Sequence, residues 1–395
     1  ARDAEPVMRH PSFLLLCAIA SCCFLSYNLV RMPVLSLFAQ SLGAGPEAIG
    51  FVISASTLTG VFLKLPSGAL SDIFGRRVLL RIGILAFALP PFVYPFVHDL
   101  TTLTALRFLH GMATAIYAPS ALATVADLFK ERRGAALGWY TASTQAGGMI
   151  GPVLGGWIVY AGGFSTTFVT AGGFGLMGLI LFLSLRLDPP PPRGDAKGFG
   201  ALLADMGTGL RLVAGNKQVL VTSLTDGGSK IANGALMAFL PIYGVTIGLN
   251  PGEVGLLFGV QGMTAFISKP IMGRVSDHLG RPPLIIIGLM ICATTFGSMP
   301  WVSGLAPLLL LAAGFGFGEA VVLTSTSAYI ADVSALNTFG AGMGMLGTLS
   351  DIGHAGGPLL AGLLIAQLNY PAAFVIIAAI QVGAAALFWV AGRSR

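Results

Sequence analysis

The chain reads Gly68-Ala69-Leu70-Ser71-Asp72-Ile73-Phe74-Gly75-Arg76-Arg77 at the end of a long apolar run. A second copy ends another apolar run 277 − 72 = 205 residues later, as Gly273-Arg274-Val275-Ser276-Asp277-His278-Leu279-Gly280-Arg281. Membrane helices end in this way at a cytoplasmic surface, because glycine favours a turn and cytoplasmic loops are enriched in Lys and Arg. Two copies in register predict a duplicated membrane unit.

The composition also indicates an integral membrane protein. Of the 395 residues, 55% are hydrophobic and only 10% are charged, and the mean hydropathy is +0.83. A water-soluble surface needs roughly 25–35% charged residues. The 54 glycines fit closely packed membrane helices. Ten-residue segments of alternating polarity are absent from the sequence, which excludes an outer-membrane barrel.

The net charge of +6 follows from membrane topology and does not indicate nucleic-acid binding. Of the 22 Lys and Arg residues, 17 flank apolar runs and five lie inside them. When loops are assigned alternately to the two membrane sides, every loop Lys and Arg falls on one side. The positive-inside rule then predicts that both termini are cytoplasmic. The short loops favour a bacterial inner (cytoplasmic) membrane.

The cysteines give no sign of a disulfide framework or a metal site. All four lie within apolar runs, at Cys17, Cys22, Cys23 and Cys292. Their spacing matches no metal-binding motif. We therefore expect neither a metal nor a cofactor.

Twelve apolar runs are long enough to cross about 30 Å of hydrocarbon. They fall near 12–39, 47–71, 78–97, 101–128, 134–161, 164–185, 217–248, 252–276, 283–302, 305–331, 337–368 and 371–392. The first run exceeds the apolar core of a signal peptide, so we expect it to be retained as a helix. The sequence predicts an all-α membrane protein with twelve transmembrane helices.

A Pro-rich hydrophilic segment divides these helices into two sets of six. We expect an N-terminal bundle at 1–187, a cytoplasmic linker at 188–216 and a C-terminal bundle at 217–395. Asp127 and Asp332 are 205 residues apart, and Pro152 and Pro358 are 206 apart. The second half is therefore a parallel repeat of the first.

The motif from Gly68 to Arg77 resembles the loop 2–3 signature of the major facilitator superfamily. A second motif, in the fifth predicted helix, resembles the antiporter signature of the drug:proton exporters within that superfamily. Its residues are Gly138, Gly147, Gly151, Pro152, Gly155 and Gly156. The resemblance implies two six-helix bundles related by a pseudo-twofold axis, and transport by alternating access.

The two motifs each have a functional and a structural interpretation. The loop motif is a candidate conformational latch that holds the cytoplasmic side closed, or a set of solvated charges. The latch residues are Gly68, Asp72, Gly75, Arg76, Arg77, Asp127, Asp277 and Arg281. In the fifth helix, glycines at a spacing of four let a neighbouring helix lie close. The resemblance adds that this face seals the cavity and bends during the transport cycle.

Ionisable residues inside the apolar runs are candidates for proton coupling, because a charge at mid-bilayer is costly. The acids are Asp226, Glu319 and Asp351, and His354 follows Asp351 by one turn. Arg107 resembles the fourth-helix arginine of the family, which is implied to influence proton transfer. Asp226 and Lys230 lie one turn apart, so a static pair between them is an equal alternative.

Basic and aromatic residues are candidates for substrate binding. Lys64 and Lys269 are 205 residues apart. They either bind an anionic group, or they snorkel or pair with Glu319 or Asp351. The other candidates are Arg31, Asn28, Lys230, Tyr27, Tyr117, Gln145 and Gln261. Five intramembrane bases against three acids leave a net charge of 5 − 3 = +2. This excess argues against a purely cationic substrate.

The sequence therefore predicts a secondary transporter, with no enzymatic activity. We expect a proton-coupled antiporter that exports a small amphipathic or anionic compound. The alternative is a proton-coupled symporter or a uniporter for an organic or inorganic anion. The expected partners are the substrate, protons and the lipid bilayer, with no nucleic acid, and the expected state is a monomer.

Overall fold

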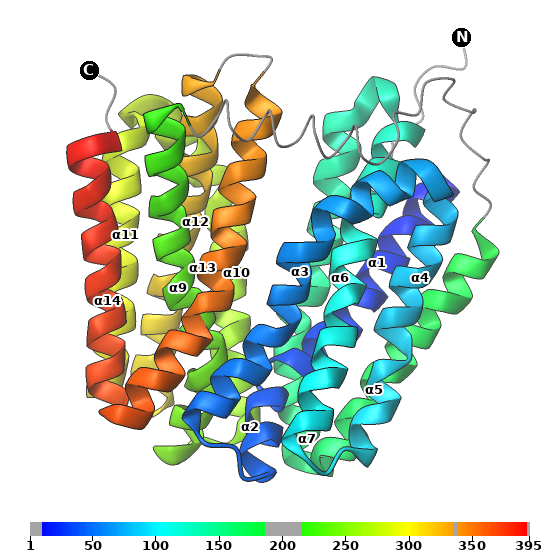
Figure 1. Ribbon diagram of the computed structural model, residues 1–395, viewed down its shortest axis with the longest axis horizontal. Coiled ribbons are helices and arrows are strands. Elements are labelled where there is room, and N and C mark those ends of the chain that lie inside the picture. The colour runs from blue at the N-terminus through cyan, green and yellow to red at the C-terminus, as the bar shows by residue number, and fades with distance from the viewer. Residues whose placement is uncertain (1–9, 186–214, 335–337, 393–395) are drawn as a thin grey trace.

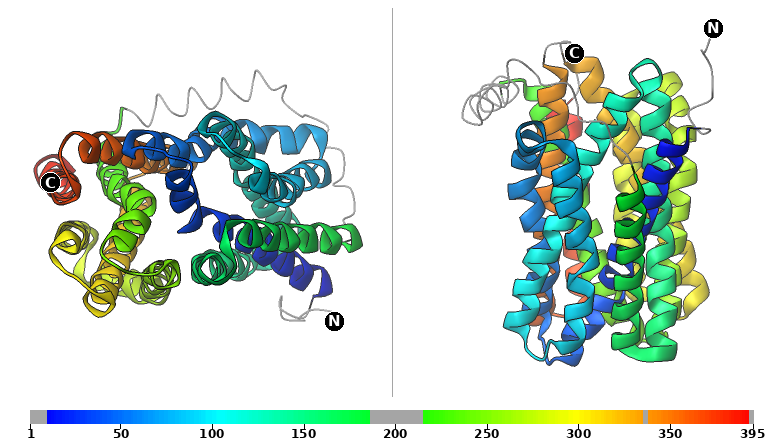
Figure 2. Two further views of the ribbon diagram at one scale, coloured as in Figure 1. Left: turned by 90° about the horizontal axis from the view of Figure 1, so that it is seen from below. Right: turned by 90° about the vertical axis from the view of Figure 1, so that its right-hand side faces the viewer.

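The computed structural model describes residues 10–185, 215–334 and 338–392, except for the side-chain surroundings of residues 65, 68, 69 and 72. Two helical bundles lie side by side (Figure 1) and are equally distinct when viewed along the helices (Figure 2). Most of the predicted linker falls outside these described ranges, so the domain boundaries stay a prediction.

The N-terminal bundle contains six membrane-crossing segments. Its helices are α1 (Pro11–Arg31), α2 (Val34–Ser41), α3 (Pro46–Phe74), α4 (Arg76–Ala88), α5 (Pro90–Val93), η2 (Tyr94–Phe96), α6 (Leu100–Leu128), η3 (Lys130–Arg132) and α7 (Arg133–Ser184). α1 continues into α2, and α4, α5 and η2 together form one crossing. α7 contains two crossings, because Gly163, with φ of 77°, reverses the chain direction within it.

The C-terminal bundle repeats this arrangement. Its helices are α9 (Lys217–Thr246), α10 (Pro251–Leu279), α11 (Arg281–Ser298), η4 (Met299–Trp301), α12 (Leu305–Val333), α13 (Phe339–Gln367), α14 (Tyr370–Leu387) and η5 (Phe388–Gly392). The structure thus confirms the predicted twelve-helix fold over the part of the chain that it describes. Gly75 and Gly280 adopt positive φ values of 89° and 85°, which permits tight turns from α3 to α4 and from α10 to α11.

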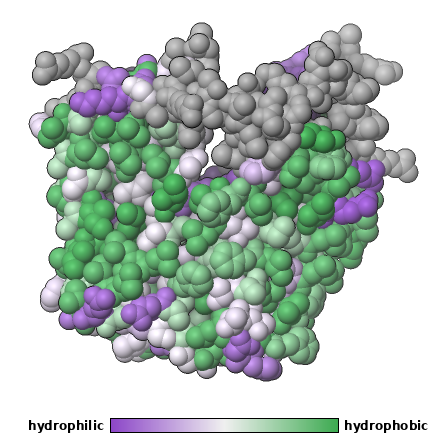
Figure 3. Space-filling model, viewed as in Figure 1, coloured by the Kyte–Doolittle hydropathy of each residue, from purple (hydrophilic) through white to green (hydrophobic). Residues whose placement is uncertain are grey.

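Hydropathy alone identifies nine stretches able to cross a membrane within the described ranges. One of them, Lys130–Ser184, holds both crossings of α7. α6 and α9 are missing from the nine, because they carry buried polar residues such as Arg107 and Asp226. Figure 3 shows a broad apolar belt on the visible face with polar residues at both ends, as a bilayer requires.

Two seams join the bundles, one between α3 and α13 and the other between α7 and α10. A Cβ atom at Gly50 or Gly255 would lie 2.3 Å from the carbonyl oxygen of Pro358 or Pro152, respectively. A Cβ atom at Gly156 or Gly362 would lie 2.3 or 2.5 Å from the carbonyl oxygen of Pro251 or Pro46. Each contact in one seam has its counterpart 205 or 206 residues away in the other. The seams are therefore related by the pseudo-twofold axis.

The bundles meet at one end of the molecule and diverge at the other. The backbone contacts of both seams lie near the end where α3 and α10 begin, which we call the closed end. At the other end, α1 begins and α14 finishes, and the bundles stand apart (Figure 1). We call this the open end. Near the open end, Gly138 of α7, Gly273 of α10 and Gly344 of α13 have no neighbouring atom within 4 Å of a built Cβ among the described residues.

Candidate functional site

A polar cavity with two connected lobes lies between the bundles. One lobe, the Asp351 lobe, has a volume of about 410 Å³ and is lined by α1, α3, α6, α9 and α13. The other, the Lys269 lobe, has a volume of about 240 Å³ and is lined by α1, α7, α9, α10, α12 and α13. Arg31, Asn233 and His354 line both lobes, so the lobes adjoin at these residues.

In the Asp351 lobe, an ion pair crosses the seam between α3 and α13. Lys64 Nζ lies 2.5 Å from Asp351 Oδ2. The side chains are 41% and 25% exposed, so water screens the pair in part. Of the two interpretations for Lys64, the one in which it pairs with Asp351 or Glu319 therefore agrees with the structure.

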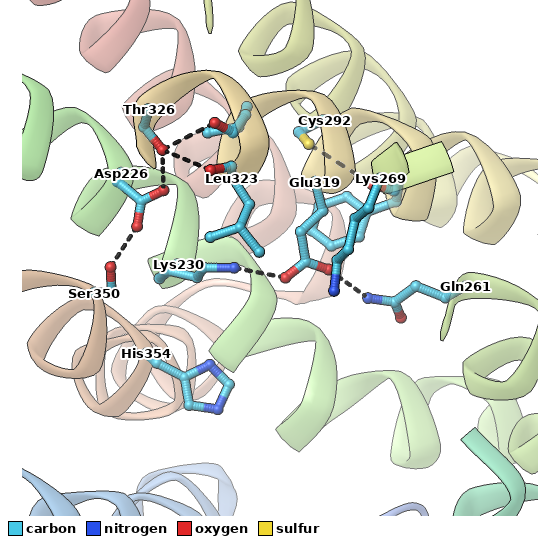
Figure 4. A network of polar contacts seen from close by, with 12 residues as sticks. Asp226, Lys230, Gln261, Lys269, Cys292, Glu319, Leu323, Thr326, Ser350 and His354 are labelled. Atoms are coloured by element: carbon cyan, nitrogen blue, oxygen red, sulfur yellow. Dashed lines mark hydrogen bonds and ion pairs between the residues drawn. The ribbon is translucent and has the colours of Figure 1, made fainter. Parts of the chain in front are cut away.

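In the Lys269 lobe, Glu319 contacts both Lys230 and Gln261 (Figure 4). Lys230 Nζ donates to Glu319 Oε1 at 2.7 Å, and Gln261 donates to the other carboxylate oxygen at 3.4 Å. Lys269 Nζ donates to Gln145 Oε1 at 3.1 Å across the seam between α7 and α10. Lys269 thus has a neutral amide as its hydrogen-bond partner, whereas Lys64 has a carboxylate.

Arg31 and His354 connect the bundles where the lobes meet. Arg31 Nη2 lies 2.8 Å from His354 Nε2. The guanidinium also stacks over the Tyr27 ring, 5.7 Å from its centroid, a cation–π contact. Arg31 Nε is buried and has no hydrogen-bond partner.

The cavity has an excess of positive charge. Four bases line it, Arg31, Lys64, Lys230 and Lys269, together with the two acids Glu319 and Asp351. The difference is 4 − 2 = +2. Within the described part of the chain, Arg31 and Lys269 have no carboxylate within the 4.0 Å of an ion pair. They are the source of the excess.

The suggested pair between Asp226 and Lys230 is wrong, and Asp226 does not line the cavity. Asp226 is fully buried and accepts hydrogen bonds from Thr326, at 3.2 Å, and from Ser350. Figure 4 shows the Asp226 side chain directed at these hydroxyls and the Lys230 side chain directed at Glu319. The aspartate side chain is too short to reach the cavity from this position on α9. Lys230 is long enough, and it pairs there with Glu319 of α12.

Tyr117 also lies outside the cavity, contrary to its assignment as a substrate-binding candidate. It is 1% exposed and accepts a hydrogen bond from Tyr140 at 3.3 Å. Its ring packs edge-on against Phe87 with centroids 5.6 Å apart. The face of α6 that carries Tyr117 packs against α4 and α7, inside the N-terminal bundle.

Arg107 lies directly behind the wall of the Asp351 lobe. It donates to Ser56, which lines that lobe, and to Tyr94 at 3.4 Å. Its guanidinium lies 5.8 Å from the centroid of Tyr27, another lining residue. His110 contacts Tyr94 at 3.2 Å. Arg107 therefore contacts two residues that line the cavity, Ser56 and Tyr27, and both are uncharged.

The repeat could have identified two lining residues that the sequence analysis missed. Asn233 lies 205 residues after Asn28, and Ser56 lies 205 residues before Gln261. All four line the cavity. Ser350, another lining residue, gave no such signal.

The loop motifs form ion pairs within each bundle. Arg76 Nε lies 3.0 Å from Asp127, and Arg281 Nε lies 3.1 Å from Asp332. Arg281 also pairs with Asp277 at 2.6 Å. The surroundings of Gly68 and Asp72 lie outside the described residues, and Arg77 is exposed. These pairs are formed while the adjacent end of the molecule is open.

The glycines of the fifth crossing contact two different helices. A Cβ at Gly147, Gly151 or Gly155 would approach atoms of α1 to 2.8, 2.6 or 2.6 Å, so α1 packs on this face. Gly156 and the Pro152 carbonyl instead contact α10 of the other bundle. The predicted close helix contact is confirmed, and the motif also contributes to the seam at the closed end.

Comparisons with known proteins identify the family. The model of the Major Facilitator Superfamily matches residues 15–225 and again 221–395. Similar relatives include the "Multi-drug resistance efflux pump PmrA homolog" of Lactococcus lactis (26% identity; 89% of this chain and 87% of the relative). Another is the "Multidrug resistance protein 1" of Bacillus subtilis (23% identity; 90% of each chain).

A solved structure has the same fold. It is a bacterial homolog of the human lysosomal transporter Spinster in an inward-facing and unoccupied conformation. The TM-score is 0.82 at 16% identity, and the match covers 99% of this chain and 98% of the other. Because the family model covers both halves, the chain belongs to the Major Facilitator Superfamily and is a multi-pass membrane transporter, not an enzyme.

Proposed function

We propose that this transporter exports a small amphipathic or anionic compound in exchange for protons. The observation that carries the proposal is Glu319, a carboxylate in the cavity wall that is held by Lys230 and Gln261. A proton on Glu319 breaks its ion pair with Lys230 and changes the charge of the site that the substrate enters. The relative that is named as a multi-drug resistance efflux pump supports export as the direction.

The open end is proposed to face the cytoplasm, with both termini on that side of a bacterial inner membrane. The loops at this end carry Arg76, Arg77, Lys130, Arg132, Arg133 and Arg281. The closed end carries Glu47, Asp99 and Glu253 instead. Lys and Arg concentrate on the cytoplasmic side of membrane proteins. The structure would then be a cytoplasm-open state.

Alternating access would require the two seams to open while the cytoplasmic ends approach each other. Both seams contain close contacts of glycine with backbone carbonyls, and Ser54 Oγ donates to the Ala355 carbonyl at 2.6 Å. In the α7–α10 seam, side chains of Met149, Val153 and Trp157 also pack on glycines of α10. Asp351 is a second proton site on this proposal, since its pair with Lys64 crosses a seam that must open.

A flux experiment tests the exchange. Proteoliposomes holding the full chain and a pH-sensitive dye are loaded with 4-phenylbutane-1-sulfonate, an amphipathic anion that keeps its charge at all working pH values. They are diluted into substrate-free buffer with the membrane potential clamped. Exchange acidifies the lumen as the sulfonate leaves, whichever way the protein is inserted. An unchanged lumen pH during sulfonate efflux would refute proton coupling.

Proton-coupled anion symport is the second candidate, and the excess charge of Arg31 and Lys269 favours it. A proton on Glu319 removes a negative charge from the cavity, so proton and anion assist each other's binding. Co-binding is the requirement for transport in the same direction. In the same proteoliposomes, symport would make the lumen alkaline as the sulfonate leaves.

A further inference from the structure

The two seams carry equivalent lysines with different partners. Lys64 and Lys269 are 205 residues apart, and their partners Asp351 and Gln145 are 206 apart. Each lysine donates across its seam to that partner, at 2.5 Å and 3.1 Å. The repeat therefore supplies an internal comparison, in which one lysine has a carboxylate partner and its equivalent has an amide.

At Lys269 this carboxylate is missing. Gln145 satisfies one hydrogen bond of the ammonium group but contributes no charge. Glu319 attracts Lys269 electrostatically, yet it forms its ion pair with Lys230 and does not come within the 4.0 Å of an ion pair from Lys269. The positive charge of Lys269 thus faces the cavity without an ion-pair partner in the described part of the chain.

We propose that the Lys269 lobe binds the anionic head group of an amphipathic monoanion. The head group takes beside Lys269 the place that Asp351 takes beside Lys64. The inference rests on the proposed function only in assuming that this cavity is the transport site. Arg31, which lines the same lobe and has no carboxylate partner among the described residues, adds a second positive charge that attracts the anion.

The rest of the lobe suits the apolar part of such a ligand. Met32, Met149, Met237, Phe258 and Leu323 line it. Methionine side chains are flexible and polarizable, and they adapt to ligands of different shape. The charged and apolar walls together select a ligand with one acidic group on a compact hydrophobic body.

The test uses three ligands with one hydrophobic body and different head groups. They are 4-phenylbutane-1-sulfonate, (4-phenylbutyl)trimethylammonium and 4-phenylbutan-1-ol, titrated by calorimetry into the full chain in detergent. The wild type is expected to bind the sulfonate at least tenfold more tightly than the other two. Tighter binding of the ammonium compound would overturn the proposal.

Substitutions at Gln145 separate charge from shape. Gln145→Glu places a carboxylate beside Lys269, so sulfonate affinity should fall at least tenfold while ammonium affinity does not fall. Gln145→Leu removes the amide without adding charge and should retain sulfonate affinity within threefold. Lys269→Gln should lower sulfonate affinity at least tenfold, whereas Lys269→Arg keeps the positive charge and should retain sulfonate binding. Wild-type sulfonate affinity in Gln145→Glu would refute the site.

The outcomes distinguish this site from the proposed function. If Gln145→Glu blocks sulfonate binding but the lumen pH of the proteoliposomes stays constant, the site stands and proton coupling fails. If flux is coupled to protons but neither Gln145→Glu nor Lys269→Gln changes sulfonate affinity, the coupling stands and the site fails.

Discussion

The seams between α3 and α13 and between α7 and α10 have the same backbone contacts but different charges. In both, glycine meets a carbonyl oxygen, and the contacts correspond pairwise through the repeat. In one, Lys64 has a carboxylate partner, whereas in the other Lys269 has an amide. The duplicated scaffold is therefore symmetric in its backbone contacts, while single side chains make the cavity asymmetric. Function is then decided at a few positions within the cavity.

The largest effect is expected from substitutions that disturb the backbone contacts. Gly50→Ala and Gly255→Ala each place a methyl group 2.3 Å from a carbonyl oxygen. Overpacking of this kind costs typically about 1–3 kcal/mol. The equilibrium between the state with closed seams and the state with open seams then shifts by about 5- to 150-fold toward open seams. Transport should fall accordingly. Spin labels at positions 98 and 301, on a cysteine-free background, should report a longer distance across the closed end.

Gly173→Ala and Gly383→Ala are matched controls, since a Cβ at either site meets no atom within 4 Å. Because the seams are equivalent in backbone, Gly50→Ala and Gly255→Ala should be similarly harmful. A large difference between them would contradict the structural symmetry.

The sequence predicted the helices well and their contacts poorly. Apolar length and the positions of Lys and Arg depend on the bilayer, and these local signals placed all twelve crossings. The partner of Lys230 depends on α12, which is distant in sequence, so the local alternative Asp226 was wrong. The assignment of Tyr117 to the substrate site was wrong for a related reason. The packing of α6 against α4 and α7 decides which face of α6 meets the cavity. The position of Asn233 in the cavity could have been predicted from Asn28 by the 205-residue offset alone.

The next effect concerns the acid in the Lys269 lobe. Protonation of Glu319 removes a negative charge near Lys230, Lys269 and the neighbouring Cys292 thiol. On electrostatic grounds, sulfonate affinity in the wild type should therefore rise as the pH falls, which is the co-binding that symport requires. An affinity that falls with the pH would instead show the competition that exchange for protons requires. Glu319→Gln should bind the sulfonate about tenfold more tightly at high pH, about 1.4 kcal/mol, with no remaining pH dependence by calorimetry.

Glu319→Gln should also abolish flux driven by a pH gradient. Asp332→Asn is the control, because its carboxylate pairs with Arg281 outside the cavity, and it should keep the pH dependence of sulfonate binding. Intact pH-driven transport in Glu319→Gln would show that another group carries the proton.

A smaller effect is expected when the two seams are made alike. Asp351→Gln converts the α3–α13 seam to the amide type and leaves Lys64 with a neutral partner. A second sulfonate should then bind, raising the calorimetric stoichiometry from one to two. Lys64 is 41% exposed, so solvent screening should make this second site about tenfold weaker. An unchanged stoichiometry would mean that the lysine and its partner do not suffice to define an anion site.

The smallest effect is expected at the open end, where the symmetry of the two bundles returns. Arg76→Gln and Arg281→Gln each remove an arginine that pairs with a partly exposed carboxylate, 35% exposed at Asp127 and 53% at Asp332. Exposed ion pairs contribute about 0–1 kcal/mol, so thermal stability in detergent should fall only slightly. Sulfonate affinity should stay within twofold, because both arginines lie outside the cavity.

If these pairs act as latches when the open end closes, both variants should slow transport to a similar extent without changing binding. Loss of binding in either variant would instead show that the open end and the cavity are energetically coupled, and the asymmetry of the molecule could no longer be assigned to the cavity alone.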